Sequence, residues 1–400
     1  MRVLIISEHY FPIQGGSTTY VYNLCKNLAD AGCEVFLVTI PDDQIPTSTW
    51  CKEENFYVYR LRIPKILRKE RYFPIFLVRK MNYILEDVNP DIIHFAHGFF
   101  APLITRINRN VAEKPIVWTI QNVPPYEHKL DLFKRLRLLN IILEKIYFFV
   151  VGLYGRLALK LFDYDHLVCV SEKTAELAMG KGAMSNKVRV IHDGVDTDFF
   201  TSKEGVSKIK EELGFQKYSP IILTVAGIIP HKGLECLVRA VPGVLEKYPD
   251  VLFLIIGPVR SEAHHRRLES LMAELGLSGN IRIIAGADQL ELGEYYAACD
   301  IYVQPSLEEG FCMSILEAMS CGKPVIGTRT GAIPRFIEES GGGILIEPAE
   351  LKQMFEAVVG LLSDPEKAKE MGERSRGYVV DNYSWKSIVK DTLRLYKSLG

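Results

Sequence analysis

The sequence alternates along its whole length between short apolar runs rich in β-branched residues and longer segments with a helical pattern. The runs that predict strands occupy residues 2–7, 34–39, 91–95, 115–120, 166–170, 188–192, 221–226, 252–257, 281–285, 301–305 and 324–328. Most of them show no in-and-out alternation, which is typical of parallel strands covered on both faces. Repeated strand–helix–strand units predict a doubly wound α/β fold.

The number of predicted strands and the chain length both indicate two domains. A chain of 400 residues is long for one hydrophobic core. We predict two Rossmann-like parallel-sheet domains facing a central cleft, at residues 1–203 and 204–380, and a last helix at 381–400 that returns to the first domain. The polar stretch 201–220 is the predicted junction. Ligands of open α/β sheets bind beyond the carboxyl ends of the strands, so we expect the site in the cleft.

The composition excludes several classes of protein. The net charge of −1 gives no general attraction to nucleic acid. The eight cysteines include no C-x-x-C pair, which predicts reduced thiols in a cytoplasmic chain. The longest uncharged run within residues 139–162 covers only 146–155, about half of the ~20 residues that a membrane span needs. The start "MRVLIIS" predicts a first strand rather than a signal peptide.

The most informative segment is "EEGFCMSILEAMSCGKPVIGT", residues 308–328. Glu309 and Gly310 fall in the loop after a predicted strand, and the free N–H groups of the following helix favour an anion such as phosphate. Glu317 lies at the edge of the apolar face of that helix and needs hydrogen-bond donors, which vicinal sugar hydroxyls supply. The alternative is that Glu317 caps a neighbouring loop and Glu309 is solvated. The spacing alone does not decide between the two.

Two loops that follow predicted strands carry further candidates. Lys232 closes the loop in "TVAGIIPHKG", where a lysine suits a diphosphate but is also compatible with simple solvation. Gly15 and Gly16 lie between the first strand and the first helix. They allow a backbone to approach a ligand, or they only allow the chain to turn. No G-x-G-x-x-G follows a strand, which disfavours dinucleotide binding.

Histidines and carboxylates give no pattern of metal ligands. His97 lies just beyond the strand at 91–95, where it can hydrogen-bond a sugar or a departing group. His94 falls inside the apolar run and is better explained as a core histidine. No carboxylate or His–Cys cluster lies nearby, so we expect no metal. The D-x-D at Asp196 and Asp198 is short enough to arise by chance.

These segments, in this order, resemble the retaining glycosyltransferases of family four, which adopt the GT-B architecture. The likeness covers nearly the whole chain. It includes "FPIQGG", "VCVSEKTAELAMGKGAMSNKVRVIHDGVDTDFF", "KG", "EEGFCMSILEAMSCGKPVIGT" and the last helix after "YSW". The glutamate pair with its "LEAM" surroundings is the most specific of these marks.

The resemblance implies a donor site and a mechanism. Residues 1–203 would bind the acceptor and residues 204–380 a UDP- or GDP-linked sugar. Glu309 would contact the donor sugar, Glu317 its ribose and Lys232 its diphosphate. The resemblance also implies that sugar or phosphate contacts the backbone of Gly310, Phe311, Cys312 and Met313. Gly15 and Gly16 would contact phosphate, and His97 would contact sugar and acceptor. The anomeric configuration would be retained without a metal or other cofactor. The leaving phosphate oxygen would take the acceptor's proton, or a short-lived ion pair would form.

The chain departs from the family pattern at several positions. Ile228 replaces the usual arginine, Cys312 a glycine, Gln121 a histidine and Arg335 a glutamate, and the two histidines are spaced H-x-x-H. Two hypotheses follow: an active glycosyltransferase with a lipid-linked or polysaccharide acceptor, and a catalytically silent GT-B subunit that binds a partner enzyme or a glycan. An NAD oxidoreductase is a poor third, because the glycine fingerprint is missing.

Basic residues are concentrated in the first domain. Residues 60–80 hold eight Lys or Arg and one acidic residue, together with Tyr72, Phe73 and Phe76, and a second basic and aliphatic stretch covers 129–160. Cations beside aromatic side chains suit an anionic lipid surface. The hypothesis is that this domain docks on the inner face of the membrane. The alternative is a solvated helix face with a packed underside.

Overall fold

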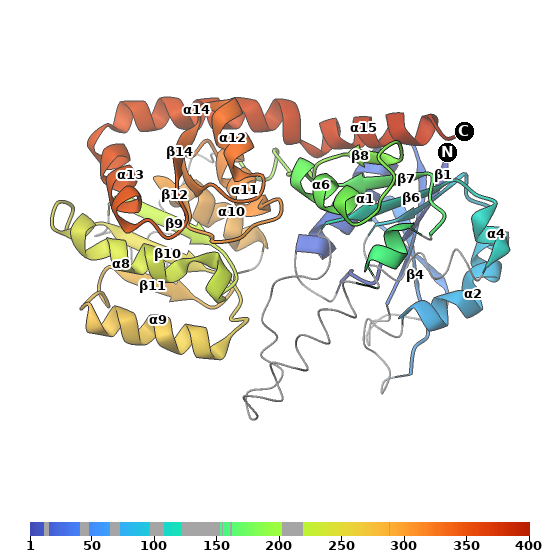
Figure 1. Cartoon of the computed structure of the whole chain (residues 1–400), viewed down its shortest axis with the longest axis horizontal. Coiled ribbons are helices and arrows are strands. Elements are labelled where there is room, and N and C mark those ends of the chain that lie inside the picture. Colours follow the sequence, from blue (N-terminus) through green and yellow to red (C-terminus); the bar gives the residue numbers. More distant parts are fainter. Residues whose placement is uncertain are drawn as a thin grey trace. The chain divides into compact units, whose positions relative to one another are not determined.

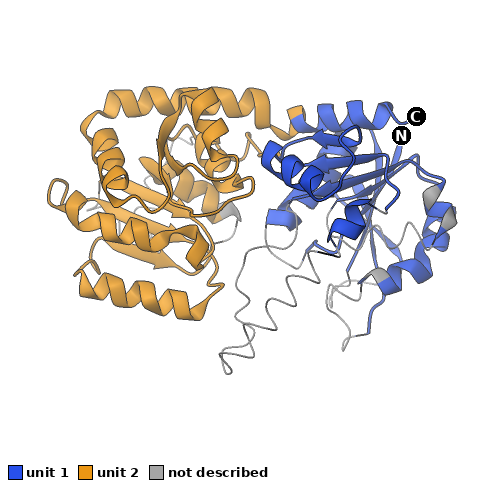
Figure 2. Cartoon of the chain, in the orientation of Figure 1, with its two compact units in different colours: residues 1–193, 388–400 blue, residues 194–387 orange. Residues whose placement is uncertain are grey.

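The computed structural model describes residues 1–11, 16–40, 48–64, 73–96, 108–121, 153, 155–160, 162–201, 219–287 and 289–400 (Figure 1). The chain divides into two compact units (Figure 2). Unit 1 contains Met1–Asp193 and Ile388–Gly400, and unit 2 contains Gly194–Ser387. Each unit is built around one β-sheet.

Unit 1 contains a sheet of eight described strands in the order β3-β4-β2-β1-β5-β6-β7-β8. Only the pair β3 and β4 is antiparallel. The strands are β1 (Arg2–Ile6), β2 (Glu34–Thr39), β3 (Trp50–Glu53), β4 (Phe56–Arg60), β5 (Ile92–Phe95), β6 (Ile116–Ile120), β7 (His166–Cys169) and β8 (Val188–Val190). The described helices are α1 (Gly16–Asp30), α2 (Phe73–Val88), α4 (Arg109–Ala112), α6 (Glu172–Gly180) and the end of α15 (Trp385–Lys397).

Unit 2 contains a sheet of six described strands, all parallel, in the order β11-β10-β9-β12-β13-β14. The strands are β9 (Ile221–Val225), β10 (Leu252–Ile256), β11 (Ile281–Ile284), β12 (Ile301–Gln304), β13 (Val325–Thr328) and β14 (Gly343–Ile346). The helices are η4 (Pro230–Lys232), α8 (Leu234–Leu245), α9 (Glu262–Glu274), α10 (Gln289–Ala298), α11 (Met313–Ser320), α12 (Ile333–Ser340), α13 (Leu351–Ser363) and α14 (Pro365–Tyr383). Helix α8 packs against α9 and α13, while α11 and α12 pack against α14.

The predicted doubly wound α/β fold is confirmed, and every predicted strand is present with its ends shifted by at most two residues. The sequence analysis missed β3, β4 and β14. Strands β3 and β4 form an edge hairpin in which polar residues interrupt the apolar pattern. Strand β14 is short and begins at a glycine, a residue that is depleted in strands.

The division between the units differs from the domain limits given by the sequence. The predicted first limit was residue 203, whereas the units divide after Asp193. The Val195 N–H donates to the Tyr383 carbonyl at 2.8 Å, and the Ser320 hydroxyl donates to the Phe200 carbonyl at 2.6 Å. These bonds join the segment after Asp193 to unit 2. The second division falls inside α15, and most of the predicted junction lies outside the described residues.

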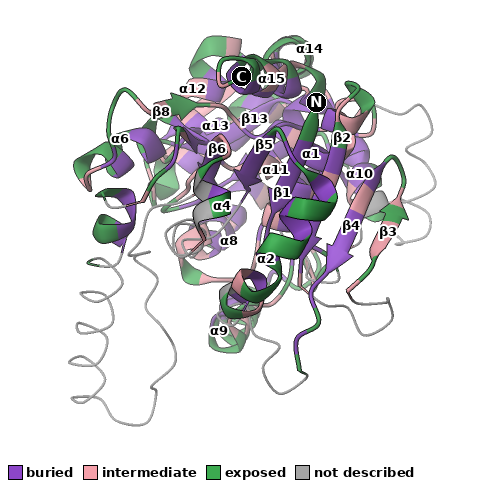
Figure 3. Ribbon diagram, turned by 90° about the vertical axis from the view of Figure 1, so that its right-hand side faces the viewer, coloured by how far each residue is buried: buried purple, intermediate pink, exposed green. Residues whose placement is uncertain are grey.

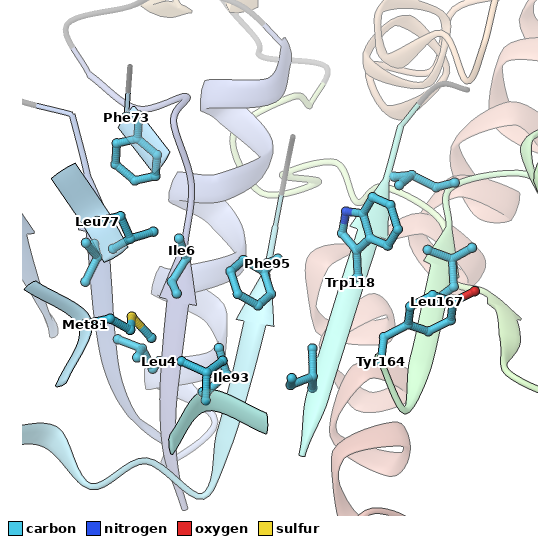
Figure 4. Packing of buried hydrophobic residues seen from close by; sticks show 14 of the residues in the cluster. Leu4, Ile6, Phe73, Leu77, Met81, Ile93, Phe95, Trp118, Tyr164 and Leu167 are labelled. Carbon is cyan, nitrogen blue, oxygen red and sulfur yellow. The ribbon is translucent and has the colours of Figure 1, made fainter. Parts of the chain in front are cut away.

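Strands β5 and β6 in the middle of the unit-1 sheet are buried at every residue and are purple in Figure 3, whereas the edge strands β3 and β8 are not buried. One face packs in a cluster to which α2 contributes Phe73, Leu77 and Met81 (Figure 4). Trp118 of β6 belongs to the same cluster and is 1% exposed. Burial on both faces is the physical reason why the strand sequences show no alternation.

His94 is a buried polar residue within this apolar sheet. Its Nδ1 lies 2.5 Å from the Tyr396 hydroxyl of α15, and its Nε2 lies 2.7 Å from the Thr119 Oγ1 of β6. Burial lowers the pKa of His94 to about 3. The structure therefore confirms His94 as a hydrogen-bonded core histidine, and its contact with Tyr396 holds the last helix on the sheet.

The basic stretch at 60–80 is not one continuous surface. Arg60 is 2% exposed, and its Nη1 lies 2.6 Å from Glu53 Oε1. Including Arg60 in a membrane-docking surface was therefore wrong, because β4 places this side chain inside unit 1. Arg79 and Lys80 on α2 are exposed, and residues 65–72 and 129–152 lie outside the described residues. Among the helices that the structure describes, none has the length and apolar character of a membrane span.

We predict that protonation of His94 opposes folding at low pH. The folded pKa of about 3 lies below the unfolded value of about 6.5, so the unfolded chain binds this proton first as the pH falls. The contribution is fully present above about pH 6.5 and decreases by up to ~1.4 kcal/mol per pH unit below it. In chemical denaturation, His94→Gln should flatten the decline of stability between pH 6.5 and 4. His265→Gln, at a partly exposed histidine of unit 2, is the matched control for the loss of a histidine side chain. Equal slopes for the wild type and His94→Gln would contradict this assignment.

Candidate functional site

The loops that follow β9 and β12 contact each other at the carboxyl edge of the unit-2 sheet. Gly233 has a φ of +65°, and a Cβ at this position would lie 2.0 Å from the Pro305 carbonyl oxygen. The Leu307 N–H donates to the His231 carbonyl at 2.8 Å. Only glycine permits so close an approach in this conformation, so Gly233 fixes the position of the neighbouring Lys232.

The loop after β13 contacts the same place from the other side. Gly331 has a φ of +54°, and a Cβ here would lie 2.5 Å from the Glu309 carbonyl oxygen. The Ala332 N–H donates to the Gly310 carbonyl at 3.2 Å. Glu309 is therefore held by backbone contacts between loops that are distant in sequence.

Lys232 and Glu309 form an ion pair in this loop cluster. The distance from Lys232 Nζ to Glu309 Oε1 is 2.6 Å, and the side chains are 21% and 7% exposed. Burial disfavours the charged lysine, but the carboxylate of Glu309 outweighs this effect and raises the pKa of Lys232 above its usual value. The structure thus brings together two residues that the sequence analysis selected separately.

A cluster of polar side chains forms hydrogen bonds with the Glu309 carboxylate and with one another. Glu309 Oε1 also accepts hydrogen bonds from Ser306 Oγ at 2.8 Å and from Gln304 Nε2 at 3.2 Å. Gln304 Oε1 accepts from the Tyr302 hydroxyl at 2.6 Å and from Ser314 Oγ at 3.1 Å. The sequence analysis missed these residues, although the polar end of the apolar strand "IYVQPS" was a visible signal.

The N-terminus of α11 lies beside this ion pair and has no side-chain cap. Its N-cap residue Cys312 has a φ of 72° in the left-handed region, and its side chain forms no capping hydrogen bond. Phe311 is buried, with its ring 5.2 Å from Phe336 and 6.0 Å from Tyr383. The side chain of Phe311 therefore packs in the core, so an anion at the start of α11 would meet the backbone of this segment rather than this side chain.

Glu317 lies one turn further along α11 and is partly exposed. Its Oε2 accepts a hydrogen bond from the Tyr296 hydroxyl of α10 at 2.7 Å. Burial raises the pKa of Glu317 to about 7, and the bond from Tyr296 acts in the opposite direction. The observed partner is a tyrosine side chain, so the alternative that Glu317 caps a loop is wrong. Tyr296 is a second contributor that the sequence analysis missed.

The remaining candidates lie in unit 1 or outside the described residues. Gly16 opens α1, and a Cβ there would meet no other atom within 4 Å. Gly15 and His97 lie outside the described residues, so the roles assigned to them stay predictions. Gln121, which stands where the family has histidine, accepts a hydrogen bond from the Ser17 hydroxyl at 2.8 Å.

The family departures in unit 2 have structural roles. Ile228 is fully buried in the apolar core and donates its N–H to the Pro258 carbonyl at 3.0 Å. Arg335 lies on α12, where its Nε is 3.0 Å from Glu339 Oε1. Both side chains therefore have partners that account for their positions.

The D-x-D segment serves the local backbone. Asp196 Oδ1 accepts from the N–H groups of Asp198 and Phe199 at 3.2 and 2.9 Å. In the part of the chain that the structure describes, no three His, Cys, Asp or Glu side chains form a group that could hold a metal ion.

Two family models match consecutive parts of the chain. The model described as "Glycosyltransferase Family 4" matches residues 14–199, and the model described as "Glycosyl transferases group 1" matches residues 206–378. The second match contains Lys232, Glu309 and Glu317. The two matches together span most of the sequence.

Two curated relatives each match a little over half of the chain. A D-inositol 3-phosphate glycosyltransferase from Corynebacterium jeikeium is 30% identical over 241 residues, which are 58% of this chain and 57% of that protein. A GDP-mannose-dependent alpha-(1-6)-phosphatidylinositol monomannoside mannosyltransferase from Mycolicibacterium smegmatis is 26% identical over 233 residues, 56% of this chain and 60% of that protein. The chain thus spans less than two thirds of the length of these two relatives.

The fold is shared with solved structures over the whole chain. A sucrose-phosphate synthase from Thermosynechococcus elongatus has a TM-score of 0.82 at 22% identity and covers 100% of this chain and 98% of its own. This likeness extends over both units, and the family models match one after the other along them. The chain is a member of glycosyltransferase family four and has the GT-B fold.

Proposed function

We propose that this chain is a retaining, metal-independent glycosyltransferase that uses a UDP- or GDP-linked sugar. The observation that carries the proposal is the arrangement at the carboxyl edge of the unit-2 sheet. There, the Lys232–Glu309 ion pair lies beside the uncapped N-terminus of α11, and Glu317 follows on the same helix. The site therefore offers a cation, free N–H groups and two carboxylates on adjacent elements.

Each part of a nucleotide sugar has a chemical counterpart in this arrangement. The diphosphate would bind Lys232 and the free N–H groups at the start of α11. The ribose hydroxyls would donate to Glu317, which has one oxygen bonded to Tyr296 and a second oxygen for the ligand. The donor sugar would donate its hydroxyls to Glu309.

The proposed transfer needs little proton chemistry from the protein. The bond from the anomeric carbon to the leaving phosphate oxygen breaks while the acceptor oxygen bonds to the same face of that carbon. The acceptor proton passes to the leaving phosphate oxygen. Lys232 and the α11 amides stabilise the negative charge that develops on the diphosphate, which favours breaking the sugar–phosphate bond.

For the acceptor, we propose an inositol phosphate or a phosphatidylinositol-type lipid. The names of the two relatives refer to inositol 3-phosphate and a phosphatidylinositol mannoside, and this supports the narrower class of acceptor over a polysaccharide. A lipid acceptor also fits the proposed position of the chain, in the cytoplasm at the inner face of the membrane.

A second candidate is a catalytically silent GT-B subunit that binds a partner enzyme or a glycan. The observation that favours it is the burial of Ile228 in the core at the position of the usual arginine. Lys232 is then the only lysine or arginine in the loop at residues 226–233, which also contains His231. Binding of a nucleotide sugar without transfer or hydrolysis would support this candidate.

The first prediction from the proposal concerns Glu317. In calorimetric titrations with UDP-glucose, UDP-N-acetylglucosamine and GDP-mannose, at least one donor should bind the wild type. Glu317→Gln should weaken the binding of that donor by roughly 1–3 kcal/mol, because a hydrogen bond to a charged group is lost. Release of the sugar from the same donor would then establish catalysis. If no nucleotide sugar binds, the proposed function fails.

The carboxyl group of Glu317 should also make donor binding depend on pH. Because the pKa of Glu317 is raised to about 7, the carboxylate that accepts ribose hydroxyls forms mainly above that pH. Donor affinity should therefore rise between pH 6 and pH 8, and Glu317→Gln should remove this rise. A rise of the same size in the variant would assign the titration to another group.

Lys232→Ala should remove donor binding and also destabilise unit 2. The substitution leaves the nearly buried Glu309 carboxylate without its cation, and loss of one partner from a buried ion pair typically costs about 3–5 kcal/mol. We expect roughly 2–4 kcal/mol, because the lysine is partly exposed. Lys352→Ala, which removes an exposed helical pair with Glu356, should change stability by less than about 0.5 kcal/mol. Unchanged stability and donor affinity in Lys232→Ala would contradict the assigned role.

The proposed membrane contact rests on the exposed face of α2. Arg79 and Lys80 are exposed there, and Ile75 is 52% exposed. Each cation near an anionic surface contributes about 1 kcal/mol. The chain should therefore sediment with vesicles that contain phosphatidylserine at low salt, and Arg79→Glu with Lys80→Glu should release it. Lys367→Glu with Lys369→Glu on α14 of unit 2 is the charge-matched control. Absence of binding to both anionic and neutral vesicles would rule out the membrane contact.

A further inference from the structure

Gln304 is the last residue of β12 and is 1% exposed. A glutamine amide has two donor hydrogens and one oxygen with two lone pairs. At Gln304 all four are used: Nε2 donates to Ser306 and Glu309, and Oε1 accepts from Tyr302 and Ser314. This complete set of partners defines the orientation of the amide, because a flipped amide would face the donors with its NH₂ group.

The partners of Gln304 belong to both parts of the proposed donor site. Glu309 lies in the loop that would bind the donor sugar, while Ser314 lies in the first turn of α11, which would bind the diphosphate. The distances are 3.2 Å from Gln304 Nε2 to Glu309 Oε1 and 3.1 Å from Ser314 Oγ to Gln304 Oε1. One buried side chain therefore fixes the loop relative to the helix.

The bond to Glu309 also determines which oxygen of that carboxylate is left for a ligand. Oε1 accepts from Lys232, Ser306 and Gln304. Among the residues that the structure describes, these hydrogen bonds all use Oε1 and none uses Oε2. A carboxylate whose first oxygen is held by three donors presents its second oxygen in a defined direction, and this is the form of preorganisation that a binding site needs.

We propose that Gln304 is the positioning residue of the nucleotide-sugar site, setting Glu309 against the first turn of α11. It touches neither the donor nor the acceptor. Its effect is on the sugar part of the ligand, because Glu309 would bind the sugar whereas Glu317 and the helix amides would bind the nucleotide. This inference rests on the proposed function, since it concerns the same site.

The proposed role requires that the Gln304 side chain is uncharged. A carboxylate in place of the amide would lie about as close to Glu309 as Nε2 does and would repel it. A protonated carboxyl group would again donate one hydrogen bond. Gln304→Glu should therefore regain function as the pH falls, a behaviour that loss of packing alone does not produce.

The test compares Gln304→Met, Gln304→Glu and the control Gln353→Met. Gln353 lies on α13 and accepts one hydrogen bond, from the Glu347 N–H at 2.7 Å, so its substitution removes a glutamine amide far along the sequence from the site. Calorimetry measures the affinity for whichever of UDP-glucose, UDP-N-acetylglucosamine or GDP-mannose binds the wild type, and for the matching UDP or GDP. Thermal melting confirms that each variant is folded.

We expect Gln304→Met to lower the affinity for the nucleotide sugar at least tenfold and the affinity for the bare nucleotide less than threefold. Gln353→Met should change neither affinity. The affinity of Gln304→Glu relative to the wild type should increase from pH 8 to pH 6. Equal losses for sugar nucleotide and bare nucleotide, or a ratio for Gln304→Glu that does not depend on pH, would overturn the positioning role.

A second probe separates this inference from the proposed function. Inorganic pyrophosphate tests only the anion site formed by Lys232 and α11. If no nucleotide sugar binds the wild type but pyrophosphate does, the proposed function fails. Gln304→Met should then change the pyrophosphate affinity less than threefold, as for the bare nucleotide, because Gln304 positions Glu309 rather than the anion site itself. A loss of pyrophosphate affinity of tenfold or more would place Gln304 in the anion site and would overturn the positioning role as well.

Discussion

A single carboxylate oxygen, Glu309 Oε1, holds the carboxyl edge of the unit-2 sheet together. It accepts hydrogen bonds from Lys232, Ser306 and Gln304, and its side chain is only 7% exposed. A carboxylate removed from water to this extent is stable only when charge and hydrogen bonds replace its hydration. The loops must therefore approach closely enough to deliver these donors. Gly233 and Gly331 permit that approach, because a Cβ at either position would collide with a backbone oxygen.

The two carboxylates that the site presents lie in different environments. Glu309 is paired with a lysine and held by two neutral donors. Glu317 accepts a hydrogen bond from a tyrosine hydroxyl, forms no ion pair among the described residues, and has a pKa that burial raises to about 7. Near neutral pH the first is fixed by the protein, whereas the second gains from any ligand that brings hydroxyl donors. This difference explains how two glutamates eight positions apart can recognise different parts of one ligand.

Much of the fold could be predicted from the sequence because parallel strands covered on both faces leave continuous apolar runs. The hairpin of β3 and β4 could not, since its edge position tolerates the polar residues that break such a run. Arg60 looked like a surface cation because its partner, Glu53, is in a strand that the pattern did not reveal. In the site, Lys232 and Glu309 were predictable from their places after strands. Gln304 and Tyr296 were not assigned, because their roles depend on contacts with side chains of other loops and helices, which no local pattern contains.

The departure at Ile228 has a consequence for how the site attracts a diphosphate. With this position filled by a core side chain, Lys232 is left as the lysine of its loop, and in the structure its charge is matched by Glu309. At the proposed site, a bare diphosphate would compete with Glu309 for that charge and would gain mainly from the α11 amides. A nucleotide sugar would also bring hydroxyl donors, which would compensate the carboxylate if the lysine bound phosphate. In the proposed function, the pairing of Lys232 with Glu309 would therefore couple recognition of the sugar to recognition of the diphosphate, because each half of the ligand would satisfy one member of the pair.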